Sequence, residues 1–104
     1  MNSNYFTKAV VNVFCDEVCG KKYMMPVMMS ILLECDTMDL CAAIEKHKRS
    51  IGTKLLLVGN YGNANYKCNP NDKVYLQGWI NFLSLPCFDD SYEAKKMVEL
   101  LKEV

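Results

Sequence analysis

The chain has 104 residues, of which 51% are hydrophobic and 23% are charged, a balance that predicts one compact domain over residues 1–104. Twelve lysine and arginine residues balance twelve acidic residues, and Arg49 is the only arginine. Without a net positive charge or several guanidinium groups, the chain is not expected to bind nucleic acid.

The apolar stretches of the chain are short. The two longest, over residues 24–33 and 80–85, are interrupted by polar residues or proline, whereas a membrane-spanning helix needs roughly 20 apolar residues. Residues 1–6 lack the basic and apolar parts of a secretory signal. We therefore expect no membrane association and a cytoplasmic location.

Residues 10–14 form the first periodic segment, and their β-branched side chains predict a strand. The alternative is a helix that ends at Gly20 and has one apolar face, formed by Val10, Val11, Phe14, Cys15 and Val18.

A buried helix is predicted over residues 27–34, which are apolar nearly all round and follow Pro26 at a favoured first helical position. Four of the seven methionines stand close together here, and one helical face holds Met25, Met28, Met29 and Leu32. Methionine fills irregular cores and also lines adaptable binding surfaces. Core packing is the preferred interpretation, with a partner or dimer groove as the alternative.

A second helix is predicted over residues 37–50, with acidic residues at its start, basic residues at its end and Gly52 just beyond it. Its core face is expected to hold Leu40, Ile44, His47 and Ile51. His47 is the only histidine, and a structural role is preferred to general-base catalysis. The short apolar run over residues 53–58 predicts a buried strand.

Residues 60–72 hold five asparagines and predict an exposed loop or a loose hairpin that carries Tyr61, Tyr66 and Cys68. Over residues 73–85, an alternation of apolar side chains favours strands with a bulge at Gly78, although a helical period through Leu76, Ile80 and Leu83 competes with it. The last segment predicts a helix over residues 91–103, capped by Asp90. Its expected apolar stripe is Ala94, Met97, Val98 and Leu101.

This order of elements predicts an α/β or α+β domain, in which helices pack on a mixed sheet and an amphipathic helix ends the chain. No phosphate-binding or dinucleotide-binding glycine motif occurs, so no cofactor is expected. Structural zinc sites use ligand pairs separated by two to four residues, and among the six cysteines only Cys15 and Cys19 fit. We therefore predict that the chain has no metal site and that its cysteines are reduced thiols.

The segment from residue 10 through the Cys19-Gly20 pair to Pro26 resembles the start of thioredoxin-like proteins. In that family a cysteine follows the first strand at a helix N-terminus, where the helix dipole favours the thiolate. The resemblance implies a thiol protein with Cys19 as the nucleophile. The chain departs from the family pattern because Lys22 stands where a second cysteine would resolve the disulfide. It also departs because residues 53–55 contain no proline where the family has one before its next strand.

The aromatic and asparagine-rich segment is the candidate interaction surface, because tyrosine and tryptophan are enriched at binding hot spots. The candidate partner-binding residues are Tyr61, Tyr66, Tyr75 and Trp79. For Tyr75 and Trp79, the alternative is a half-buried position in the sheet.

We therefore expect a small, non-enzymatic regulator or inhibitor that binds a partner protein through this segment. Abundant lysine, asparagine and tyrosine are typical of an AT-rich coding sequence, which indicates a phage or virus origin and a host protein as the partner. One alternative is the thioredoxin-like thiol protein. The other is a structural homo-oligomer, such as a homodimer, paired through the methionine-rich helix or a sheet edge.

Overall fold

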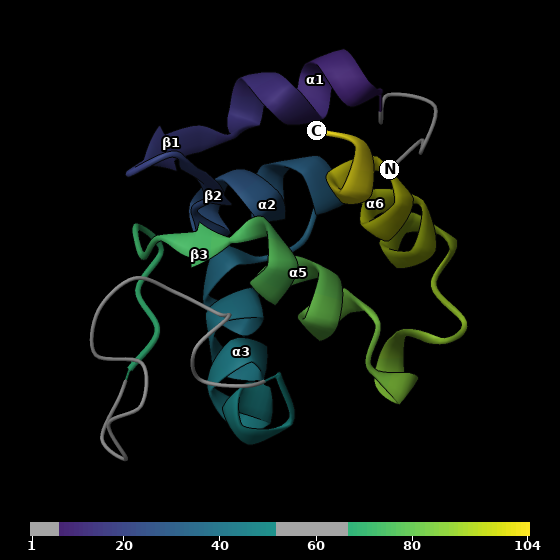
Figure 1. Cartoon of the computed structure of the whole chain (residues 1–104). Helices are drawn as coiled ribbons and strands as arrows, with labels where there is room; N and C mark the ends of the chain where they lie inside the picture. The colour runs from purple at the N-terminus through teal and green to yellow at the C-terminus, as the bar shows by residue number, and fades with distance from the viewer. Residues whose placement is uncertain (1–6, 52–66) are drawn as a thin grey trace.

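The structure, a computed structural model, describes residues 7–51 and 67–104 (Figure 1). Within them the elements follow in the order α1 (Lys8–Phe14), β1 (Asp16–Val18), β2 (Lys21–Met24), α2 (Pro26–Leu33), α3 (Thr37–Ile51), β3 (Val74–Tyr75), α5 (Leu76–Leu83), the 3-10 helix η2 (Pro86–Phe88) and α6 (Tyr92–Glu103). In Figure 1, α1 lies across the top of the molecule, beside the end of α6.

The described strands form one small sheet in the order β1-β2-β3, and both pairings are antiparallel. The β1-β2 hairpin turns at Cys19 and Gly20, whose φ angles of 52° and 79° are both positive, as in the type I′ turns of two-residue hairpins. Helix α5 packs on β2 and β3. The fold class is confirmed as α+β, and these strands contain no parallel pair of the kind that a mixed sheet would have.

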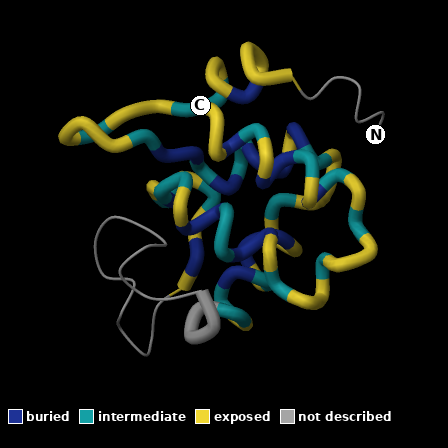
Figure 2. Tube along the Cα trace, turned by 45° about the vertical axis from the view of Figure 1, so that its right-hand side comes forward, coloured by how far each residue is buried: buried dark blue, intermediate teal, exposed yellow. Residues whose placement is uncertain are grey.

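The hydrophobic core lies where α5 and α6 pack together and contact the surrounding helices. Figure 2 shows buried segments at the centre of the fold and exposed ones along the hairpin and the outer loops. The largest fully buried side chains include Trp79, Phe82, Met24, Met29, Ile44 and Met97.

Three predicted helices, α2, α3 and α6, are confirmed. Helix α2 starts at Pro26, and Met29 and Leu32 on its predicted face are buried, which agrees with core packing. The whole predicted stripe of α6 is buried. The predicted cap of α6, Asp90, is wrong by one residue, because the Ser91 hydroxyl accepts the Ala94 N–H at 3.1 Å.

The strand predicted over residues 10–14 is wrong, because these residues lie in α1. The Thr7 hydroxyl caps this helix by accepting the Val10 N–H at 3.2 Å. Val11 is fully buried, and Phe14 packs against the core from the same helix. Packing on the core therefore overrides the strand preference of the valines.

The strands predicted within residues 73–85 are confirmed only at β3, because α5 begins at Leu76. Gly78 lies inside α5 and not at a bulge. The buried residues of α5 recur at helical spacing, at Gly78, Trp79, Phe82 and Leu83. Burial of this face decides between the two competing periods in favour of the helix.

The strand predicted over residues 53–58 and the loop predicted over residues 60–66 lie outside the described residues. Residues 67–72 form a loop, as predicted, and Cys68 is buried within it. On α3, Leu40 and Ile44 are buried and His47 is half-buried. None of the helices in residues 7–51 and 67–104 combines the length and the apolar character needed to cross a membrane.

Candidate partner-binding groove

A groove of about 470 Å³ lies between the β1-β2 hairpin, the first turn of α5 and the end of α6. Its floor is mostly apolar and consists of Tyr75, Leu76, Leu101 and Val104. Its rim carries polar and charged side chains, Glu17, Lys21, Lys22 and Gln77. The groove therefore combines an apolar floor with a rim on which lysines outnumber carboxylates.

Lysines cover two tyrosine rings that lie opposite each other on neighbouring strands, Tyr23 on β2 and Tyr75 on β3. The Lys21 Nζ lies 5.2 Å from the centre of the Tyr75 ring, and the Lys73 Nζ lies 5.6 Å from the centre of the Tyr23 ring. Both distances are within the range of a cation–π interaction. Of these two lysines, Lys21 lines the groove, and it therefore holds a positive charge at the edge of the apolar floor.

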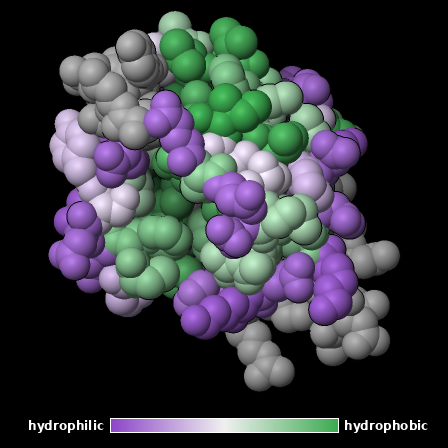
Figure 3. All heavy atoms as spheres, turned by 180° about the vertical axis from the view of Figure 1, so that it is seen from behind, coloured by the Kyte–Doolittle hydropathy of each residue, from purple (hydrophilic) through white to green (hydrophobic). Residues whose placement is uncertain are grey.

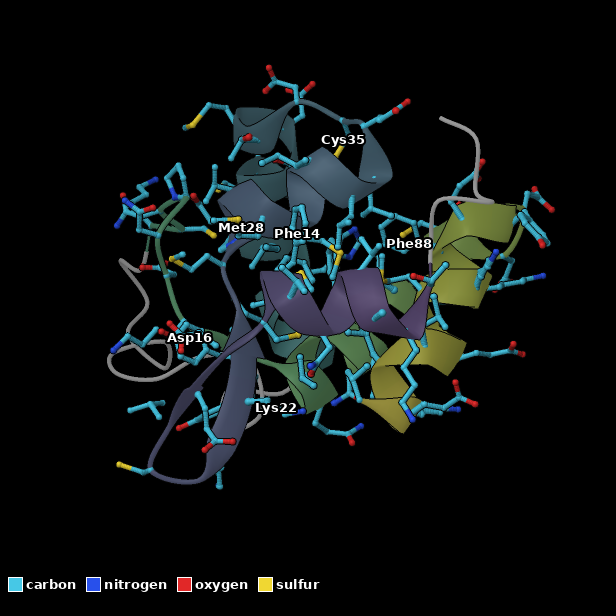
Figure 4. The ribbon with its side chains drawn as sticks, turned by 90° about the horizontal axis from the view of Figure 1, so that it is seen from above. Phe14, Asp16, Lys22, Met28, Cys35 and Phe88 are labelled. Carbon is cyan, nitrogen blue, oxygen red and sulfur yellow. The ribbon has the colours of Figure 1, made fainter. Side chains whose placement is uncertain are left out.

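Lys22 connects three parts of the fold. Its Nζ donates a hydrogen bond to Asn12 Oδ1 on α1 at 2.9 Å and a longer one to the main-chain oxygen of Val104 at 3.4 Å. Figure 4 shows Lys22 on the hairpin, beside α1. Because Lys22 is half-buried and has these two partners, we interpret it as a positioning residue that fixes the hairpin against the helices.

Tyr23 is buried next to Asp16, its partner across the β1-β2 pair. Burial raises the pKa of the Tyr23 phenol, and the charge of Asp16 and the hydrogen bond to it raise the pKa further. The neutral phenol therefore stabilises the fold at pH values below its unfolded pKa of about 10, and this contribution is lost as the pH rises through the folded pKa.

We expect Asp16→Asn to lower the pKa of Tyr23, because it removes the negative charge that disfavours the phenolate. An NMR titration of ¹³C-labelled tyrosine rings measures this pKa, and Tyr23→Phe assigns the signal. A Tyr23 pKa that is unchanged in Asp16→Asn would show that Asp16 does not act on the phenol.

The structure separates the four predicted partner-binding residues. Tyr61 and Tyr66 lie outside the described residues, and half-buried Tyr75 lines the groove. The prediction for Trp79 as a contact residue is wrong, because its side chain is 0% exposed and its indole N–H donates to the Met24 carbonyl at 2.8 Å. Trp79 is a core residue whose one polar group has a partner inside the protein.

The thioredoxin-like expectation for Cys19 does not agree with the fold. Cys19 is exposed in the hairpin turn, between two strands, and not at the N-terminus of a helix. The helix-dipole argument for a reactive thiol therefore does not apply to it. Burial raises the pKa of the Cys15 thiol, against the opposing effect of Lys22, and burial together with Asp36 and Asp39 raises the pKa of Cys35.

Several groove residues were not among the sequence-based candidates, namely Lys21, Leu76, Leu101 and Val104. They come from parts of the chain that are distant in sequence, so no local motif marks them. In the part of the chain that the structure describes, no three His, Cys, Asp or Glu side chains gather as ligands for a metal ion. Comparison of the sequence and the fold with protein-family models, curated proteins and solved structures finds no match.

Proposed function

We propose that the protein is a small, non-enzymatic binding module that takes a segment of a partner protein into the groove between the hairpin, α5 and α6. By this binding it would regulate or inhibit a host protein, with the phage or virus origin that the composition indicates. The observation that carries the proposal is the apolar floor around Leu76 and Leu101 with the positive charge of Lys21 at its edge. An apolar centre with a polar rim is the usual anatomy of a protein interface.

The rim defines the chemistry of the partner segment. The Lys21 ammonium favours an acidic side chain, and the floor favours an apolar or aromatic one. Gln77 is exposed at the groove and offers an amide that can both donate and accept hydrogen bonds. The expected ligand is therefore an extended peptide with at least one carboxylate next to an apolar anchor.

Selection of a displayed library of random peptides against the protein tests this proposal. We expect acidic peptides with an apolar anchor to be enriched, and Lys21→Glu to weaken their binding by about tenfold or more, because it places like charges together. Isothermal titration calorimetry measures the change in affinity.

Lys73→Glu is the matched control, because Lys73 also covers a tyrosine ring but does not line the groove. It should leave the affinity close to that of the unmodified protein. The proposal would be contradicted if Lys21→Glu and Lys73→Glu lost the same amount of peptide affinity. Enrichment of peptides without acidic residues would contradict it as well.

A second candidate function is self-association through an apolar surface on α1 and α2. Figure 3, seen from behind, shows hydrophobic side chains gathered at the top of the molecule, where these helices lie. Val13 is 78% exposed and Ile31 is 55% exposed. Figure 4 shows Phe14 and Met28 at the place where α1 and α2 face each other. Exposed apolar surface of this kind favours a homo-oligomer over an isolated monomer.

Sedimentation velocity over a range of concentrations tests this second candidate. A concentration-dependent mass that Val13→Lys and Ile31→Lys reduce to the monomer mass would support it. Tyr92→Lys, at an exposed position of α6, is the control and should not change the mass. A monomer at all concentrations would exclude self-association.

A further inference from the structure

The two lysines that line the groove differ in how firmly their ammonium groups are held. The Lys22 Nζ donates hydrogen bonds to Asn12 Oδ1 at 2.9 Å and to the main-chain oxygen of Val104 at 3.4 Å. Lys21 is exposed, and within the described part of the chain its ammonium forms no ion pair and no hydrogen bond. Its contact there is the Tyr75 ring, whose centre lies 5.2 Å from the Nζ. Lys21 can therefore move to a new partner without breaking a hydrogen bond.

Tyr75 provides the aromatic ring of the groove floor, and Lys21 lies over that ring. Tyr75 occupies the N-cap position of α5 with an extended backbone, and its side chain makes no capping hydrogen bond. The residue is half-buried and lines the groove together with the lysine that covers it. The ring face under Lys21 is therefore part of the groove, and an apolar side chain of a ligand can contact it once the lysine has moved.

Two attractions compete for the Lys21 ammonium when a ligand enters the groove. A cation–π contact at an exposed site is weak. A bound ligand shields the groove from water, and this strengthens the attraction between unlike charges. A charge-assisted hydrogen bond from the ammonium to a ligand carboxylate is then stronger than the contact with the ring.

We propose that Lys21 and Tyr75 together set the specificity of the groove, with Lys21 as a displaceable cover of the Tyr75 ring. A carboxylate of the peptide draws the Lys21 ammonium off the ring, and the neighbouring apolar anchor packs on the ring face that this movement uncovers. A peptide with an anchor but no carboxylate must displace Lys21 without giving it a new partner, so it binds more weakly. The inference rests on the proposed function, because it requires that the groove binds such a peptide.

The second lysine–tyrosine pair of the sheet is an internal control. The Lys73 Nζ lies 5.6 Å from the centre of the Tyr23 ring, and neither residue lines the groove. Tyr23 is only 7% exposed, which leaves little of its ring for a ligand. Peptide binding should therefore leave this pair unchanged while it separates Lys21 from Tyr75.

Proton NMR of the lysine side chains follows the proposed movement directly, because hydrogens held over the face of an aromatic ring resonate upfield. In the free protein, the Hε signals of Lys21 and Lys73 should both lie upfield, and Tyr75→Leu should remove the upfield shift of Lys21. Saturation with an acidic peptide selected from the displayed library should return the Lys21 signals to the ordinary lysine position and leave those of Lys73 upfield. Lys21→Ala and Lys73→Ala assign the signals.

Calorimetry with two peptides tests the consequence for specificity. The selected acidic peptide is compared with a counterpart in which asparagine or glutamine replaces each acidic residue. Lys21→Ala should weaken binding of the acidic peptide. It should strengthen binding of the uncharged counterpart by about two- to fivefold, the factor that corresponds to a cation–π contact at an exposed site. Lys73→Ala should change neither affinity.

The inference is overturned if the Lys21 signals stay upfield in the saturated complex, or if Lys21→Ala does not strengthen binding of the uncharged counterpart. Either result would leave the proposed function standing, because the acidic peptide still binds. An absence of the upfield shift of Lys21 in the free protein would overturn the inference without any peptide, and this measurement does not depend on a variant that folds. If no acidic peptide binds, the proposed function fails, and the inference fails with it.

Discussion

Trp79→Ala should lower the free energy of unfolding by about 3–5 kcal/mol, the range for removing a large aromatic side chain from a core. The Trp79 side chain is fully buried, and its ring packs edge-on against Phe82 with 5.9 Å between ring centres. The variant also deprives the Met24 carbonyl of its hydrogen bond from the indole. Urea unfolding followed by circular dichroism measures the loss.

Trp79→Phe separates the contribution of the indole hydrogen bond from that of the packed aromatic ring. It keeps an aromatic ring but removes the indole N–H, so the buried Met24 carbonyl loses its partner, and we expect a loss of about 2–3 kcal/mol. Tyr92→Ala is the surface control, because Tyr92 is 63% exposed, and it should change the stability by less than about 0.5 kcal/mol. A loss in Trp79→Ala as small as that of the control would mean that Trp79 is not in the core.

Phe82→Ala should cost a similar amount, about 3–5 kcal/mol, because Phe82 connects two aromatic neighbours within the core. Its ring centre lies 5.1 Å from that of Phe88, and both of its ring pairs are edge-to-face, which is a favourable arrangement. Urea unfolding followed by circular dichroism also measures the loss of unfolding free energy in this variant.

The double variant Trp79→Leu/Phe82→Leu, compared with its two single variants, tests whether the two rings act together. Residues in contact give losses that are not additive, by about 0.5 kcal/mol or more. Strict additivity of the two single losses would contradict the direct packing of Trp79 on Phe82.

The helices α2, α3 and α6 could be predicted because each has a start signal followed by an apolar pattern. Pro26 opens α2, and the Asp36 carboxylate accepts the Asp39 N–H at the start of α3. Where neighbouring residues can both cap a helix, as Asp90 and Ser91 can, sequence alone leaves the exact boundary open. The structure assigns the cap to Ser91.

At α1 and α5 the sequence supports a helix only as the alternative to a strand, because two local patterns compete in each segment. Helix α1 contains three valines, whose β-branched side chains favour strands, and α5 begins after Tyr75, which provides no side-chain cap. In both, the deciding contacts come from distant parts of the chain. Val11 and Trp79 are buried by other helices and strands, and this burial is not visible in the local pattern.

The candidate groove was predictable only at Tyr75, which the aromatic segment singled out. Lys21 lies at the start of β2, in a hairpin that the sequence pattern did not reveal, and Leu101 was expected only as part of the α6 stripe. A groove built from the hairpin, α5 and α6 requires the tertiary fold, so its lining could not be read from motifs.

The most direct test of the account is an NMR titration of the ¹⁵N-labelled protein with an acidic peptide selected from the library. Occupation of the groove predicts the largest shifts for the backbone amides of Gly20, Lys21, Gln77 and Val104, which line it on three different elements. Shifts confined to α1 and α2, around Val13 and Ile31, would instead place the partner on the apolar surface and contradict the groove as the binding site.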